Sequence, residues 1–208
     1  MSKSSSRVRK LVTLAILAAL GSALMWVEVP FIPPFKFDIS DSTVIIATVL
    51  YGPLGGVAVA LVKSIVHMLI ISVGDFGVGE MVAFVASMSY TLPFYYTMLL
   101  LKKTVKNPLL LRIIPCVVGI ASLTVMMYYF NIYVSFPLYS LATNTPFTHK
   151  EIVAFSTSFI PGNIIKGVGL SIVFLLLSFR LDYIATKYLC DEDECPLIIN
   201  RTHVKGIK

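Results

Sequence analysis

The chain alternates long apolar segments with short polar ones. A helix that crosses a bilayer needs about 20 mostly apolar residues. Apolar segments that can serve as such helices lie at about residues 11–29, 42–52, 54–71, 80–101, 109–134 and 159–181. The pattern predicts an all-α protein with six transmembrane helices in a single membrane domain at residues 1–188, followed by a polar tail at 189–208.

The apolar run from Ser42 to Ile71 is too long for one span. Its middle is interrupted by four residues that favour turns, Gly52, Pro53, Gly55 and Gly56. Glycine and proline are the strongest local signals for a turn. We therefore predict two short helices, 42–52 and 54–71, joined by a tight turn.

Basic residues mark one side of the six predicted helices. They lie before the first helix, between the fourth and fifth, and after the sixth, at Arg7, Arg9, Lys10, Lys102, Lys103, Lys106, Arg112, Arg180 and Lys187. Basic residues in short flanks favour the cytoplasm, so both termini are predicted to be cytoplasmic. The loops at 36–41, 72–79 and 135–158 then lie outside. The last is the longest, and we expect it to be a lid or a disordered loop.

Composition supports the membrane assignment. The sequence is 57% hydrophobic and 13% charged, whereas about a quarter of the residues in a soluble domain are charged. The net charge of +6 comes from the termini and one short loop, which indicates membrane topology rather than nucleic-acid binding. Cys116, Cys190 and Cys195 are too few and too poorly placed for a disulfide framework. We expect reduced thiols and no bound metal.

Lys63 and His67 are ionisable residues inside the third predicted helix. Such groups cost on the order of a few kcal/mol at membrane depth, so each is a candidate for function. The two residues are one turn apart and face the same way. They either line a polar cavity or form interhelical hydrogen bonds.

Asn163 and Lys166 lie three residues apart at the start of the sixth predicted helix, after Pro161 and Gly162. A carboxamide both donates and accepts hydrogen bonds, whereas an ammonium only donates. Together they suit a planar ligand edge that alternates carbonyl and N–H groups, and Asn131 near the outer end of the fifth helix is a third candidate. From the residues alone, ordinary interhelical bonding is the more frequent alternative.

Acidic residues gather on the predicted outer side, at Asp38, Asp41, Asp75 and Glu80. Asp38 and Asp41 are three residues apart and can bind hydroxyl groups or a cation. Solvated loop acids are the more frequent alternative. The sequence has no HExxH zinc helix and no GxSxG elbow, and Glu80 lacks a second intramembrane carboxylate with which to form an acid pair. It also lacks a phosphate-binding loop, so an ATP-driven cycle would need the nucleotide site of a partner.

Small residues recur once per turn along the first predicted helix, at Ala15, Ala19 and Ala23. In a bilayer such a stripe lets another helix approach closely. From the residues alone, a helix of the same chain is the favoured partner.

Several short motifs together resemble one family of membrane proteins. They are Lys36-Phe37-Asp38-Ile39-Ser40-Asp41, Tyr51-Gly52-Pro53-Leu54-Gly55-Gly56, Val62-Lys63, Val78-Gly79-Glu80, Asn131 with Pro137-Leu138-Tyr139, and Ile160-Pro161-Gly162-Asn163-Ile164-Ile165-Lys166-Gly167. Over residues 7–181 the chain resembles the substrate-binding S components of energy-coupling-factor (ECF) vitamin transporters. The second half is most similar to the riboflavin-specific members.

The resemblance implies a fold, a cargo and partners. It implies a multi-pass protein of a bacterial cell membrane, with a vitamin site near the outer face closed by the first, third and fifth loops. The expected partners are a transmembrane coupling protein and two cytoplasmic ATPases. Riboflavin is then cargo rather than cofactor, and no enzyme activity is expected. The stripe at Ala15, Ala19 and Ala23 matches the family's docking surface for the coupling protein, which reverses the preference for an internal partner.

The resemblance also assigns the site. Asn131, Asn163 and Lys166 match the residues that bond the isoalloxazine ring in the riboflavin members. To these we add Asp38, Asp41, Lys63 and Glu80 as candidate substrate-binding residues.

Three alternatives remain at this stage. Family members for pantothenate, folate and cobalamin share the fold, so any of these vitamins is an alternative cargo. An intramembrane enzyme that uses Glu80, His67 or Lys63 is a second alternative, and a carrier that works without ATPases is a third.

Overall fold

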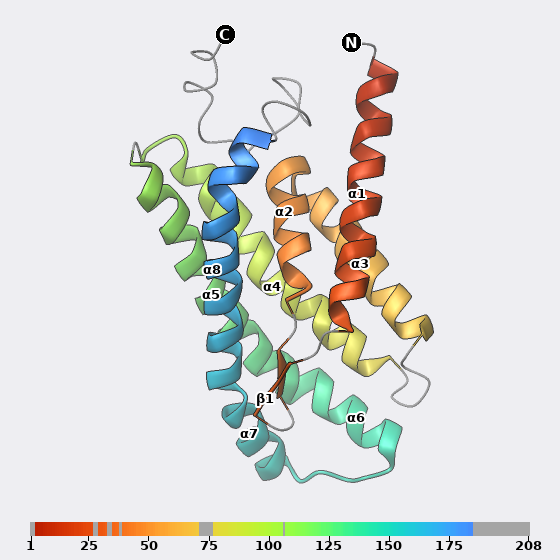
Figure 1. The fold of residues 1–208 in the computed structure, drawn as a ribbon. Helices are drawn as coiled ribbons and strands as arrows, with labels where there is room; N and C mark the ends of the chain where they lie inside the picture. Colours follow the sequence, from red (N-terminus) through yellow and green to blue (C-terminus); the bar gives the residue numbers. More distant parts are fainter. Residues whose placement is uncertain are drawn as a thin grey trace.

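The computed structural model describes residues 3–26, 29–32, 35–37, 39–70, 77–105 and 107–184. The elements in chain order are α1 (Lys3–Met25), β1 (Val29–Ile32), β2 (Phe35–Phe37), α2 (Asp41–Tyr51), α3 (Pro53–Ile70), α4 (Val78–Leu101), α5 (Pro108–Phe130), a π-helical turn η1 (Asn131–Ser135), α6 (Phe136–Thr143), α7 (His149–Ser158) and α8 (Ile160–Ile184). They form an upright bundle (Figure 1).

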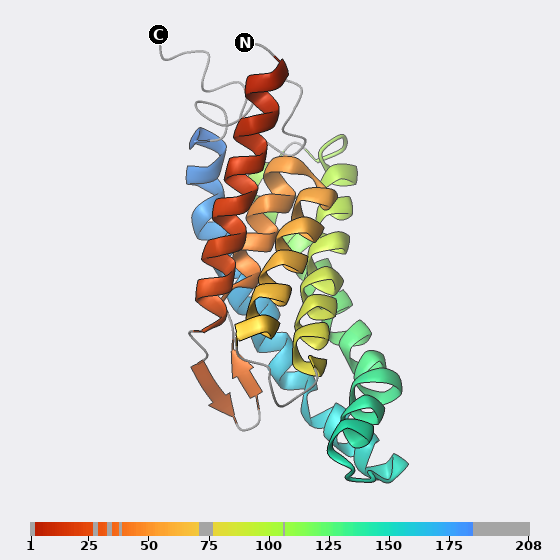
Figure 2. The same cartoon turned by 90° about the vertical axis from the view of Figure 1, so that its right-hand side faces the viewer.

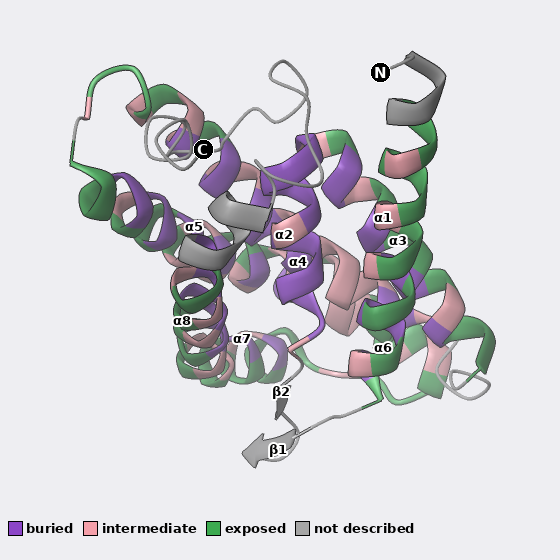
Figure 3. Cartoon of the chain, turned by 45° about the horizontal axis from the view of Figure 1, so that its top comes forward, coloured by how far each residue is buried: buried purple, intermediate pink, exposed green. Residues whose placement is uncertain are grey.

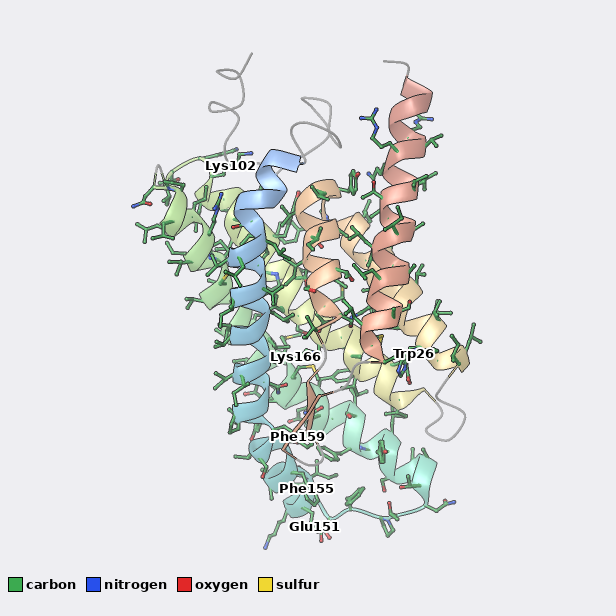
Figure 4. The ribbon with its side chains drawn as sticks, in the orientation of Figure 1. Trp26, Lys102, Glu151, Phe155, Phe159 and Lys166 are labelled. Atoms are coloured by element: carbon green, nitrogen blue, oxygen red, sulfur yellow. The ribbon has the colours of Figure 1, made fainter. Side chains whose placement is uncertain are left out.

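The prediction of six spanning helices is confirmed. Among the described residues, five helical stretches are long and apolar enough to cross a membrane, and α2 is a sixth, shorter apolar helix. The start of α1 and the end of α8 lie at the same end of the bundle (Figure 1), as an even number of spans requires. Lys102 lies at that end too (Figure 4).

The predicted turn between α2 and α3 is also present. Gly52 separates the helices with φ 81° and ψ −177°, a conformation that is essentially restricted to glycine. Gly52 N–H donates to Thr48 O at 2.9 Å and so ends α2. Gly56 lets the start of α3 pack against α2, because a Cβ there would overlap the Thr48 hydroxyl.

Helix α2 is the centre of the bundle. Ten of its 11 residues are buried, and Figure 3 shows it enclosed while the outward side of α1 is exposed. Two apolar clusters lie on either side of it. One joins α2 to α4, α5 and α8 and includes Ile45, Phe94 and Phe174. The other joins it to α1 and α3 through small residues such as Ala18 and Ala60.

The expectation of a loop at 135–158 is wrong. The turn η1 continues α5, and α6 and α7 follow. Helix α7 begins with a capping box formed by Thr148 and Glu151, in which Glu151 Oε2 accepts a hydrogen bond of 2.7 Å from Thr148 N–H. The Thr-x-x-Glu spacing at Thr148 is a recognised signal for a helix start, so this helix was detectable in the sequence.

The first outer connection also contains structure that the sequence did not predict. Strands β1 and β2 pair antiparallel, with Val29 opposite Phe37 and Pro30 opposite Lys36. The hairpin lies at the end of the bundle opposite the start of α1, on the other side from α6 and α7 (Figure 2). This end therefore carries the β1–β2 pair, α6 and α7.

We predict that Gly56→Ala destabilises the bundle. The added methyl group forces the Thr48 hydroxyl away from Val44 O, to which it donates at 2.8 Å. Overpacking of this kind costs about 1–3 kcal/mol, more than the helix propensity that alanine restores. The measurement is the thermal unfolding midpoint in detergent. Gly79→Ala is the matched control because nothing lies within 4 Å of its added Cβ, and equal midpoints for the two variants would contradict the prediction.

Candidate functional site

Asp41, the first residue of α2, is the centre of a buried polar cluster. Its Oδ1 accepts hydrogen bonds from Lys63 Nζ of α3 and Ser87 Oγ of α4. Its Oδ2 forms an ion pair of 2.8 Å with Lys166 Nζ of α8. A carboxylate in the first turn of a helix is also favoured by the helix dipole. Four helices therefore meet at one side chain.

The two lysines of this cluster differ in environment. Lys63 is fully buried, and it also donates to Ser40 Oγ at 2.6 Å. The side chain of Lys166 is 11% exposed. Figure 4 shows Lys166 on α8 between the end marked by Lys102 and the end marked by Glu151. The structure thus brings three predicted site residues together, but as partners of one another.

Asn131 and Asn163 do not belong to the charged cluster around Asp41. Both are buried, at 7% and 5% exposure, yet within the described part of the chain neither side-chain amide forms a hydrogen bond. Buried polar side chains are nearly always bonded. These two amides, which have no hydrogen-bonding partner in the part of the chain that the structure describes, are therefore candidates for contact with a ligand.

Local structure explains how these two amides are placed. Asn131 is the first residue of η1, and π-helical turns occur frequently at functional sites. Asn163 lies one turn before Lys166 and on the same side of α8. Helix α8 packs closely on α5 at Gly167, where an added Cβ would lie 2.9 Å from Ile120 Cγ1.

His67 and Glu80 form a second buried pair. His67 Nδ1 lies 2.8 Å from Glu80 Oε1, which joins the last turn of α3 to the first turn of α4. Lys63 and His67 were predicted either to line a polar cavity or to form interhelical hydrogen bonds. The structure shows interhelical bonds for both residues. Asp38, the remaining predicted site residue, lies outside the described residues.

An open groove of about 560 Å³ lies between the start of α4 and α6. Its described lining is Gly77, Val78, Met81, Leu138, Leu141, Ala142 and Asn144. None of these is a predicted site residue, and the groove was missed because α6 was expected to be a loop. Among the described residues, no group of three or more His, Cys, Asp or Glu side chains is placed to hold a metal ion. Cys190 and Cys195 lie outside those residues.

Comparison with known proteins identifies the family. Residues 9–178 match the family described as ECF transporter, substrate-specific component. The chain is an ECF S component. It is therefore a multi-pass protein of the bacterial cell membrane and a transport component rather than an enzyme.

Two curated relatives and one solved structure are similar over most of their length. The Riboflavin transporter RibU of Staphylococcus aureus (strain TCH60) is 34% identical over 177 residues, which cover 83% of this S component and 90% of the relative. The Riboflavin transporter FmnP of Bacillus subtilis (strain 168) is 31% identical over 181 residues, covering 84% and 93%. The solved structure, described as "Structure and mechanism of the S component of a bacterial ECF transporter", has a TM-score of 0.64 at 33% identity and covers 87% of this chain and 99% of that one.

The alanine stripe of this S component faces outward. Ala15, Ala19 and Ala23 are all exposed, whereas Ala18 and Gly21 on the same helix are buried. The stripe therefore meets no other helix among the described residues. The internal partner favoured from the residues alone is therefore not observed among the described helices.

Sequence reasoning missed Ser40 and Ser87, which complete the Asp41 cluster. Ser40 precedes a helix without any sign that it bonds across the bundle, and Ser87 is one of several hydroxyl residues in its span, with Ser89 and Thr91, so that nothing singles it out. A serine in an apolar helix more often bonds to its own backbone. The only available signal was that a buried carboxylate at position 41 needs several donors.

We predict that His67 and Glu80 are energetically coupled. Replacing either with alanine leaves the other without its buried partner, so the double variant loses less stability than the sum of the two single variants. A coupling of about 1–3 kcal/mol is expected for such a contact. It is measured from unfolding in detergent for the wild type, His67→Ala, Glu80→Ala and the double variant. Additive losses would show that the contact contributes nothing.

Proposed function

We propose that this S component captures riboflavin from outside the cell and delivers it through an ECF importer. The observation that carries the proposal is the pair of buried, unbonded amides at Asn131 and Asn163, one of them a single turn from Lys166. The names of the two curated relatives support the choice of riboflavin.

The chemistry of these side chains fits the pyrimidine edge of a flavin. That edge presents an acceptor, a donor and an acceptor in sequence. Carboxamides can complement both kinds of group, and the Lys166 ammonium can donate to a carbonyl. A site built to satisfy hydrogen-bonding groups rejects ligands that lack them, because its own buried groups are then left unpaired.

The other predicted site residues have smaller roles in this proposal than Asn131, Asn163 and Lys166. Asp38 is a proposed contact to the ribityl hydroxyls. Glu80 is bonded to His67, so any contact with the ligand would have to share its carboxylate. Asp41 and Lys63 are enclosed by protein and support Lys166 rather than contact the ligand.

Delivery requires partners. The sequence has no phosphate-binding loop, so the energy is supplied by two cytoplasmic ATPases through a transmembrane coupling protein. The outward stripe of Ala15, Ala19 and Ala23 is the proposed docking surface, since small residues let helices approach closely in a bilayer. The S component then tilts within the membrane as the ATPases cycle.

The visible spectrum of the purified protein tests the cargo. We predict a flavin-like yellow absorbance for protein from cells grown in rich medium, and its loss in Asn163→Ala/Lys166→Ala. Loss of the two contacts lowers riboflavin affinity about 100-fold or more. Lys150→Ala, which removes an exposed lysine of α7, is the control and keeps the colour. A colourless wild type that ignores riboflavin but binds pantothenate, folate or cobalamin would reject the cargo and retain the class.

Co-purification with the coupling protein tests the docking surface. We predict that Ala19→Leu greatly reduces recovery of the coupling protein while riboflavin binding stays unchanged, because the longer side chain holds the partner helix away. Ala121→Leu makes the same change at an exposed position of α5 and leaves recovery at the wild-type level. Equal recovery with both variants would place the docking surface elsewhere.

A further inference from the structure

The carboxylate of Asp41 is enclosed by protein. Its side chain is 1% exposed, one oxygen is bonded to Lys63 and Ser87, and the other is paired with Lys166. With 1% of its side chain exposed, Asp41 has almost no accessible surface to offer a ligand. It therefore acts on the protein around the ligand rather than on the ligand.

Lys63, like Asp41, is enclosed by protein rather than open to a ligand. It is 0% exposed, whereas the Lys166 side chain is 11% exposed. The aliphatic part of Lys63 lies against Gly21 of α1, with its Cδ 3.5 Å from the position that a Cβ at Gly21 would take. The burial pattern thus divides the predicted site into groups that can face a ligand and groups that cannot.

We propose that Asp41 is the positioning residue for Lys166, and that Lys63 and Ser87 in turn fix Asp41. This inference rests on the proposed function, because it assigns to Lys166 the recognition of the ligand edge. Asp41 holds the Lys166 ammonium at the place from which that recognition occurs.

The physical advantage of this arrangement is preorganisation. A lysine ammonium sits on a flexible four-carbon stem and loses much conformational freedom when it is fixed. If the carboxylate fixes it before the ligand arrives, that loss no longer weakens binding. The carboxylate also supplies the counter-charge that an ammonium needs at membrane depth.

A double-mutant cycle between positions 41 and 166 tests the proposal. Riboflavin dissociation constants are measured from the quenching of flavin fluorescence for the wild type, Asp41→Asn, Lys166→Met and the double variant. Loss of the Lys166 contact is expected to weaken binding about 10- to 100-fold, and Asp41→Asn is expected to produce a loss of similar size. The double variant should bind no more weakly than Lys166→Met alone, because Asp41 has nothing left to position.

Losses that multiply in the double variant, or wild-type affinity in Asp41→Asn, would overturn the positioning role alone. A wild type that does not bind riboflavin would overturn the proposed function and the positioning role with it. The two failures are therefore distinguished by the first measurement of the series. A purely structural role also lowers stability, but it predicts the same fold-loss whether or not Lys166 is present.

Ser87→Ala repeats the test without changing a buried charge, in case Asp41→Asn does not fold. It removes one donor to Asp41 Oδ1, and we expect a loss of affinity of about 5-fold that disappears in the Lys166→Met background. Ser89→Ala, a buried serine two residues away on α4, is the matched control with unchanged affinity. A Ser87→Ala loss that persists in the Lys166→Met background would overturn the positioning role.

Discussion

The buried carboxylate of Asp41 constrains the whole bundle. An isolated charge at membrane depth is too costly to keep, so the groups that pair with it must arrive together when the helices assemble. These groups come from α3, α4 and α8, and the carboxylate itself starts α2. The short helix α2 is therefore held in the middle of the protein, where its polar first turn is surrounded by donors instead of lipid. Removing one partner of such a cluster leaves the others buried and uncompensated.

Much of the fold could be predicted because its signals are local. Apolar runs end at proline, glycine or lysine, and the unusual division at Gly52 follows from residues that interrupt a single segment. The start of α7 was also encoded locally, in the spacing of Thr148 and Glu151. The polar composition of the stretch favours a loop, whereas the capping pattern favours the helix that the structure contains. The strands β1 and β2 had no comparable signal, since a short strand that contains proline has no clear alternating pattern.

The candidate site shows where local reasoning stops. Sequence spacing correctly placed Lys63 and His67 on one face, but it could not show that one meets Asp41 and the other meets Glu80, because these contacts join different helices. From the sequence, Asp41, Lys63 and Lys166 are all predicted ligand contacts. The sequence cannot show that Asp41 and Lys63 are more deeply buried than Lys166. The free amides of Asn131 and Asn163 follow from a deficit of partners, which only a three-dimensional structure can reveal.

Helix α1 connects this cluster to the outer surface of the protein. Its alanine stripe faces outward, while Gly21 on its inner side leaves no room for a Cβ, which would lie 2.6 Å from Thr43 Oγ1 and 3.5 Å from Lys63 Cδ. A displacement of α1 towards the bundle must therefore move Thr43 or Lys63, and Lys63 is bonded to the carboxylate that pairs with Lys166. Close packing transmits such shifts because protein interiors have few voids to absorb them. If a partner on α1 changes the affinity for the ligand in this way, the ligand must change the affinity for that partner by the same factor. Under the proposed function, Gly21, Lys63 and Asp41 are the contacts that connect the docking surface on α1 to the ligand site.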